Sequence, residues 1–208
     1  MDDVAQRLLL IFALVLGHVL PAGAQTGEAD ALPPVAGEEI EAELTVEQAR
    51  TEMLDALFER LADAEAEDWE RTQNEINAIW NDSGSASMDL LARRADKAMA
   101  KDDYETALLH LDDLVRLAPD FAEGWNKRAT VYFLQENYGL SLEDIAETLR
   151  REPRHFGALS GLGIILDRLG DKPGALEAFR RAIRIHPNLE GAQKGIDKLE
   201  TEVEGERL

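Results

Sequence analysis

The sequence predicts an all-α protein, an α-solenoid built from stacked helical hairpins, and three observations lead to this prediction. Pro119, Pro153 and Pro187 recur with a 34-residue period, and a fixed period of this length is typical of a repeat array. Within each period, large apolar residues recur at the three- and four-residue offsets of an amphipathic helix. A small residue also recurs with the same period, where two helices must approach closely. The chain is therefore expected to offer a binding surface.

Residues 1–24 predict a secretory signal peptide. Residues 8–20 form an apolar run that is shorter than the roughly 20 residues of a membrane-spanning helix. The Ala-Gly-Ala triplet that ends at Ala24 is typical of a cleavage site, so we expect cleavage after Ala24 and export to the periplasm. Because Asp2 and Asp3 make the start acidic where signal peptides are basic, a retained anchor or a different start stays open.

Residues 25–44 are small, acidic and proline-containing, and this composition predicts a disordered linker. From residue 45 to residue 80, apolar residues return at helical spacing in two stripes, separated by the acidic stretch 64–68. We expect an N-terminal helical hairpin at 45–80, with a degenerate repeat as the alternative and with Trp80 as a core anchor. Because Ser85 stands where the repeat proline would fall, this hairpin leaves the 34-residue period. Its expected role is to cap the first hairpin of the array.

Residues 81–87 predict a loop, in which Ser85 or Ser87 would be the N-cap of the next helix. Glycine and serine in this segment would also suit an anion-binding nest. However, the segment contains no Lys or Arg. The loop is therefore the favoured interpretation.

Three repeats are predicted at residues 88–121, 122–155 and 156–189, followed by a capping helix at 190–204 that is mostly polar, as the last unit of an array must be. The positions that correspond between the repeats are Leu91, Arg94, Ala95, Ala98, Ala107 and Leu111, then Trp125, Arg128, Ala129, Tyr132, Ser141 and Ile145, then Leu159, Leu162, Gly163, Leu166, Ala175 and Phe179. This pattern resembles W-x2-L-G-x2-Y, A-x3-F and P of the tetratricopeptide-repeat family, from Met88 to about Leu199.

Two arginines depart from the family pattern. Arg94 and Arg128 stand where the family usually has an aliphatic residue, and their long stems are expected to cover apolar surface while the charge stays in water. Between the helices of the third repeat, Gly170 suits a left-handed C-cap and Pro173 a first helical turn.

The resemblance implies a superhelix whose concave face, lined mainly by the first helix of each repeat, binds a protein or peptide partner. Carried over position by position, the groove residues are Arg93, Asp96, Met99, Asn126, Lys127, Thr130, Phe133, Leu134, Ser160, Ile164, Asp167, Arg168, Lys194 and Lys198. Among them, Asn126 is suited to bond a peptide backbone. One subset of the family clamps a C-terminal carboxylate with Lys and Asn. Ala92 and Asp96 hold the corresponding first-repeat positions here, so no clamp is expected.

The charge of the chain is strongly acidic and uneven. The net charge is −20, and residues 25–87 hold 17 acidic against 3 basic residues, whereas residues 88–208 hold 23 against 18. An acidic surface is poorly suited to nucleic acid or anionic lipid, because both require Lys and Arg to neutralise phosphate. The favoured interpretation is a solvated surface, with no nucleic-acid and no membrane partner.

No residue pattern indicates a catalytic, metal or cofactor site. The chain contains no cysteine, which excludes disulfides and thiolate chemistry. His110, His155 and His186 occupy three different places in their repeats without a partner at ligand spacing. We expect His155 and His186, beside turn prolines, to be ordinary polar surface residues. The alternative function is a mainly structural, self-associating array, in which the acidic hairpin of one copy docks on basic residues of another.

Overall fold

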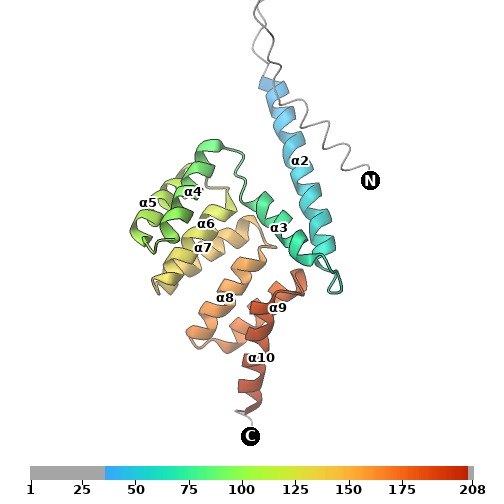
Figure 1. The fold of residues 1–208 in the computed structure, drawn as a ribbon, viewed down its shortest axis with the longest axis vertical. Coiled ribbons are helices and arrows are strands. Elements are labelled where there is room, and N and C mark those ends of the chain that lie inside the picture. The colour runs from blue at the N-terminus through green and yellow to red at the C-terminus, as the bar shows by residue number, and fades with distance from the viewer. Residues whose placement is uncertain (1–35, 206–208) are drawn as a thin grey trace, which may run out of the picture. The chain divides into compact units, whose positions relative to one another are not determined.

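A computed structural model describes the backbone of residues 36–205 and the side chains of residues 45–202. Every regular element in this part of the chain is an α-helix, so the predicted all-α class is confirmed (Figure 1). The helices are α2 (Ala36–Leu61), α3 (Trp69–Trp80), α4 (Ala86–Met99), α5 (Tyr104–Leu117), α6 (Ala122–Leu134), α7 (Tyr138–Arg151), α8 (Phe156–Arg168), α9 (Lys172–Ile185) and α10 (Glu190–Gly205). The predicted signal peptide at 1–24 lies outside the described residues. None of the helices described is long and apolar enough to cross a membrane.

Helix α2 begins earlier than the sequence pattern predicts. Residues 25–44 are expected to form a disordered linker, yet the helix starts at Ala36. The segment 36–44 is rich in alanine and glutamate, which are among the best helix formers. Residues 36–44 have few apolar side chains for a core, but they can still extend helix α2 from its packed C-terminal part.

Each repeat is a hairpin of two helices in contact, α4 with α5, α6 with α7 and α8 with α9. The predicted small residues Ala95, Ala129 and Gly163 are buried where the helices of a hairpin meet. A Cβ atom on Gly163 would lie 2.6 Å from the ring of Phe179, and one on Gly195 would lie equally close to the other side of that ring. Phe179 thus packs between glycines of α8 and α10, and α10 stacks on the array as a further first helix would.

The turns inside the three repeats share one backbone conformation. Asp102, Glu136 and Gly170 hold equivalent positions in successive repeats, and their φ angles are 57°, 59° and 86°. This left-handed conformation is favourable for glycine and strained for other residues. The prediction of a left-handed residue at Gly170 is confirmed, and the same geometry recurs where the sequence gives no glycine signal.

Arg128 is held by acidic residues that lie one helix away. Its Nε and Nη2 atoms donate to the carboxylate of Asp144 at 2.7 and 2.8 Å, and Nη1 donates to Asp112 at 2.8 Å. Asp144 is buried, and the hydrogen bonds to it raise the pKa of Arg128 above its usual range. The guanidinium also lies over the rings of Trp125 and Tyr132. A buried ion pair therefore replaces the aliphatic contact expected of the family at this position.

The N-terminal hairpin, α2 and α3, packs on the turns that follow the second and third repeats. Its buried cluster consists of Leu54, Leu57, Phe58, Leu61, Ile76, Trp80 and Phe156, with Ile185 and Leu189 packed against it. Polar contacts join the same surfaces, since Arg154 pairs with Asp55 at 2.6 Å and Asn188 donates to the carbonyl of Ala64 at 3.2 Å. The prediction that this hairpin caps the first repeat is therefore wrong. That prediction placed the hairpin on its neighbour in sequence. Instead, the apolar residues of α2 and α3 pack against Phe156, Ile185 and Leu189.

Candidate functional site

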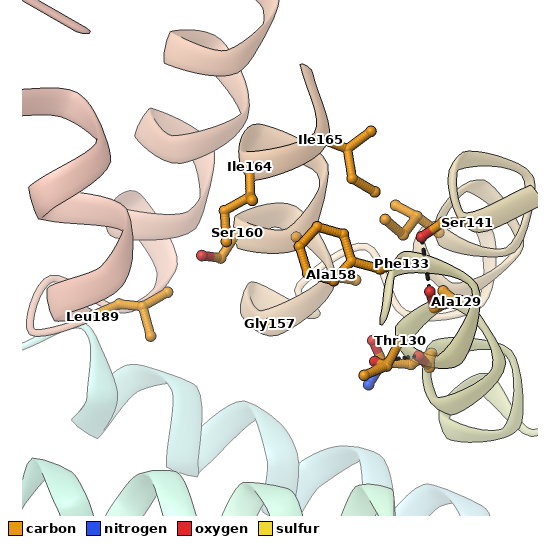
Figure 2. Close-up of a pocket in the computed structure, with 13 residues that line it drawn as sticks. Ala129, Thr130, Phe133, Ser141, Gly157, Ala158, Ser160, Ile164, Ile165 and Leu189 are labelled. Atoms are coloured by element: carbon orange, nitrogen blue, oxygen red, sulfur yellow. Dashed lines mark hydrogen bonds between the residues drawn. The ribbon is translucent and has the colours of Figure 1, made fainter. Parts of the chain in front are cut away.

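A pocket of about 290 Å³ opens between α6 and α8 (Figure 2). It is lined by Asn126, Ala129, Thr130, Phe133, Ser141, Ile145, Gly157, Ala158, Ser160, Gly161, Ile164, Ile165 and Leu189. None of these residues carries a formal charge. The pocket therefore offers an uncharged, largely apolar surface between the first helices of two successive repeats.

Small residues create the space in this pocket. Gly157 and Gly161 lie one turn apart on α8 and present no side chain. A Cβ atom on Gly161 would meet nothing closer than 3.8 Å, at Ile145. Ala129 and Ala158 complete the lining from α6 and α8. The volume thus comes from missing side chains on an otherwise regular helix pair.

The pocket hydroxyls are largely used by the backbone. Ser141 donates to the carbonyl of Ala129 at 2.8 Å, and Thr130 donates to the carbonyl of Asn126 at 2.9 Å. Both bonds draw the polar atom toward the helix that carries the acceptor (Figure 2). A ligand would therefore meet the methyl and methylene surfaces of these residues more than their oxygens.

Five of the predicted groove residues come together at this pocket: Asn126, Thr130, Phe133, Ser160 and Ile164. Figure 2 shows Thr130 and Phe133 extending from α6 and Ser160 and Ile164 from α8. The 34-residue register is what places them on facing helices. Arg168 lies over the Phe133 ring at 4.8 Å and donates to the Tyr138 hydroxyl at 2.7 Å, so it supports the pocket wall.

The three predicted lysines of the groove are held in ion pairs. Lys127 contacts Asp96 of the preceding repeat at 2.9 Å. Lys198 of α10 contacts Asp167 of α8 at 2.7 Å, and Lys194 contacts Glu190 on its own helix at 2.8 Å. The first two pairs link neighbouring helices, and the third lies within one helix. None of these lysines lines the pocket.

The remaining predicted groove residues also lie outside the pocket. Met99 packs against the core of the first hairpin. Arg93 and Leu134 are exposed. Leu189, which the sequence reasoning missed, lines the pocket and also packs against the N-terminal hairpin. Its position two residues after Pro187 was the available signal, because it is equivalent to Phe121 and His155.

His155 is buried, which corrects the prediction of a polar surface residue. Only 4% of its surface is exposed. Its Nδ1 atom accepts from the backbone N–H of Ala158 at 3.0 Å, which caps α8, and its Nε2 atom lies 3.1 Å from Oε2 of Glu123. The imidazole stacks on the indole of Trp80, with centroids 4.3 Å apart and planes 9° apart.

His186 is also buried, so the surface prediction is wrong for this residue too. Its Nε2 atom lies 2.6 Å from Oε1 of Gln73, while Nδ1 is buried without a hydrogen-bond partner. The ring contacts Trp69 and Phe156. Burial in these surroundings lowers the pKa of His186. Both histidines are thus part of the interface with the N-terminal hairpin, which their spacing in the sequence could not show.

No group of three or more His, Asp or Glu side chains is placed to hold a metal ion within the part of the chain that the structure describes.

The sequence matches a known repeat family and, over most of its length, a known relative. The tetratricopeptide repeat family matches residues 93–147 and 135–190. A TPR repeat-containing protein of Rhizobium etli is 42% identical over 155 residues, which cover 74% of this chain and 76% of the relative.

Solved structures share the fold at lower identity. The Sgt2 TPR domain from Aspergillus fumigatus has a TM-score of 0.56 at 22% identity and covers 59% of this chain and 83% of that one. The first TPR domain of Spaghetti (RPAP3), solved with an HSP90 peptide, has a TM-score of 0.54 at 17% identity and covers 56% of this chain and 92% of that one. The repeat period, the stacked hairpins and the relative from Rhizobium etli lead to one conclusion: the chain belongs to the tetratricopeptide-repeat family.

Proposed function

We propose that this protein is an exported adaptor, which binds a protein or peptide partner on the concave face of its repeat array. The pocket between α6 and α8 is the anchor site. The observation that supports this function is the convergence of five predicted groove residues from two repeats on one uncharged, apolar pocket. Concave, largely apolar sites with a few polar groups are the usual form of a binding site. A peptide occupies the TPR domain of Spaghetti, at 17% identity.

The pocket assignment is tested by crosslinking from within it. A photoreactive amino acid at position 164 is compared with one at position 140, because Ile164 and Leu140 have nearly equal exposure, 39% and 38%, while only Ile164 lines the pocket. We expect a discrete adduct from position 164 and none from position 140. Gly161→Leu, which fills the pocket, should remove the adduct. Equal labelling from both positions, or an adduct that persists with Gly161→Leu, would contradict the assignment.

A binding measurement gives the size of the effect once the partner is identified. Ile164→Glu places a charge in the apolar pocket and should weaken partner binding by at least about tenfold. Leu140→Glu on the outer helix is the matched control and should leave the affinity unchanged. Both residues are exposed, so the helical signal by circular dichroism should stay the same in both variants.

Export is a separate part of the proposal and needs its own test. It rests on the apolar run 8–20 and the cleavage triplet that ends at Ala24. Cell fractionation with N-terminal sequencing should recover a periplasmic chain that begins at Gln25. A cytoplasmic chain with an intact N-terminus would contradict export. The proposed binding site would not be affected by that result, because the crosslinking experiment tests it separately.

A further inference from the structure

The Asn126 amide is the one amide side chain among the residues that line the pocket, and its orientation is fixed by its neighbours. Its Nδ2 atom donates to Oε2 of Glu123 at 3.1 Å. Its Oδ1 atom has no hydrogen bond to any other described residue, although Asn126 lines the pocket. A carboxylate is an acceptor only, so turning the amide over would set two acceptors against each other. Asn126 therefore keeps its carbonyl oxygen free as an acceptor, beside the second N–H of the same amide.

Glu123 is held in place by two further residues. Only 9% of its surface is exposed, and its Oε1 atom lies 3.6 Å from Nζ of Lys127. Its Oε2 atom lies 3.1 Å from Nε2 of His155. Because Nδ1 of His155 accepts from the backbone N–H of Ala158, the ring proton is on Nε2 and is donated to Glu123. The carboxylate that orients Asn126 is thus oriented by a buried histidine.

The histidine is in turn held by the N-terminal hairpin. Trp80, the last residue of α3, stacks on the imidazole and donates from Nε1 to Oε2 of Glu152 at 3.3 Å. Trp80 also packs against Phe58 of α2, with centroids 5.9 Å apart. A second contact reaches the pocket from the same hairpin, because Leu189 belongs to both surfaces. The hairpin is therefore linked to the pocket through Leu189 and through the contacts that orient Asn126.

The charge around the pocket decides which ligand fits. The groove cations Lys127 and Lys198 are already paired with acids, and Arg168 is bonded to Tyr138. A carboxylate in the pocket would find no cation among the residues that line it, would face the acceptor oxygen of Asn126 and would lie near Glu123. An apolar side chain beside a main-chain N–H would be complementary to both the lining and the free oxygen.

We propose that the α2–α3 hairpin takes part in ligand binding, because it orients Asn126 through Trp80, His155 and Glu123. The pocket then binds an uncharged, apolar segment, whose main-chain N–H donates to Asn126. A segment that ends in a carboxylate is rejected. The proposal rests on the function proposed above. In it, His155 and Trp80 are positioning residues, and Asn126 is the residue that accepts the ligand's main-chain hydrogen bond.

The test measures discrimination between two forms of one peptide. Peptides are first selected on the purified full chain from a library of uncharged ten-residue sequences with one leucine or phenylalanine. The best peptide is then synthesised with its anchor residue last, either as a C-terminal amide or as a free acid. Fluorescence anisotropy gives the two affinities and their ratio. We expect the amide to bind at least about tenfold more tightly than the acid, because only the acid buries an unpaired charge.

The variants separate positioning from simple support. His155→Asn keeps an acceptor that can cap α8 but loses the bond to Glu123 and the stack on Trp80. It should reduce the amide-to-acid ratio by about tenfold, because the Asn126 amide is free to turn. Trp80→Phe keeps a ring against His155 and should retain the ratio within about twofold. Trp80→Ala should bind the amide and the acid with nearly equal affinity. Circular dichroism checks that the array stays folded.

The outcomes distinguish this inference from the proposed function. Peptide binding that Gly161→Leu does not weaken would place the ligand elsewhere and overturn both. Binding that Gly161→Leu abolishes, with an unchanged ratio in His155→Asn, would keep the site and overturn the role of the hairpin. A wild-type preference for the acid would overturn the ligand class.

Discussion

The second repeat (residues 122–155) and the third (residues 156–189) carry different residues at equivalent positions. Where the second repeat has Glu123 and Lys127, the third has Gly157 and Gly161. Lys127 reaches back to Asp96 and ties the first two repeats together by an ion pair. The glycines leave the corresponding junction between the second and third repeats open as a pocket. Two positions on the first helix thus decide whether it is bridged to the first helix of the preceding repeat or leaves a pocket beside it.

The two repeats also differ inside their hairpins. The second repeat joins its helices by Arg128 and Asp144, and the third has Leu162 and Ala178 at the equivalent positions. The same backbone arrangement is therefore stabilised by a buried ion pair in one repeat and by apolar packing in the next. Buried pairs lose most of their charge solvation, so their contribution depends on both partners being present.

The largest effect is expected from breaking the buried pair of the second repeat. Asp144→Ala leaves the guanidinium of Arg128 without its buried partner and should lower the free energy of unfolding by about 3 kcal/mol. The double variant Arg128→Leu with Asp144→Ala copies the third repeat and should regain most of that loss. Urea unfolding followed by circular dichroism measures both. A double variant as unstable as Asp144→Ala would mean that the two repeats are not interchangeable at this pair.

The next effect comes from giving the open junction the bridge of the closed one. Thr130→Asp with Gly161→Lys copies Asp96 and Lys127 one repeat further along, and should weaken peptide binding by at least about tenfold because the new pair fills the pocket. Gly139→Asp with Ala146→Lys, at exposed positions of α7, is the charge-matched control. If the bridged variant binds as the wild type does, the open junction is not the binding site.

A smaller effect is expected at the turns inside the repeats. Glu136 holds the left-handed conformation that glycine holds at Gly170. Glu136→Gly should stabilise the array by up to about 1 kcal/mol, since it removes steric strain. Gly170→Ala should change the free energy of unfolding in the opposite direction. Two changes of the same sign in thermal melting would show that backbone strain does not distinguish these turns.

The smallest effect should come from one titrating residue at the end of the third repeat, where the second repeat has Glu152. Burial lowers the pKa of His186 below its ordinary value of 6.5. Below pH 6.5 the unfolded chain binds a proton that the folded chain does not, so stability falls as the pH drops below 6.5. Above pH 6.5 the buried, neutral His186 makes its full contribution to the free energy of unfolding. Melting temperatures between pH 8 and pH 5 should fall less steeply for His186→Gln than for the wild type, and parallel curves would count against this assignment.

Much of the array was accessible from the sequence, because its signals are local. The proline spacing sets the register, and the register places Asn126, Phe133 and Ile164 on one pocket. Gly157 and Gly161 could be seen in the sequence, but the pocket that they leave could not be predicted. A glycine within a helix does not show whether a neighbouring side chain fills the space beside it. Leu189 carried one local signal, its place two residues after Pro187, but it lies in a turn and not on the first helices from which the groove was predicted.

The contacts of the two histidines were not predictable. His155 stands beside Pro153 in a turn, where a polar surface residue is ordinary, and only the approach of Trp80 buries it. Similarly, Arg128 read alone is a departure from the family pattern, and its partner Asp144 becomes meaningful only when α6 and α7 face each other. Both cases depend on a partner from another helix.

The sequence by itself determined that this protein is a helical array and where its repeats begin, and it predicted which helix faces line a groove. These features follow from periodicity, which is a property of the chain at short range. The tertiary structure decided where the N-terminal hairpin packs and which groove residues meet in a pocket. It also decided that a tryptophan at position 80 stacks on a histidine at position 155. Such contacts join residues far apart in sequence through shape and burial, and no local pattern specifies the partner of an apolar stripe.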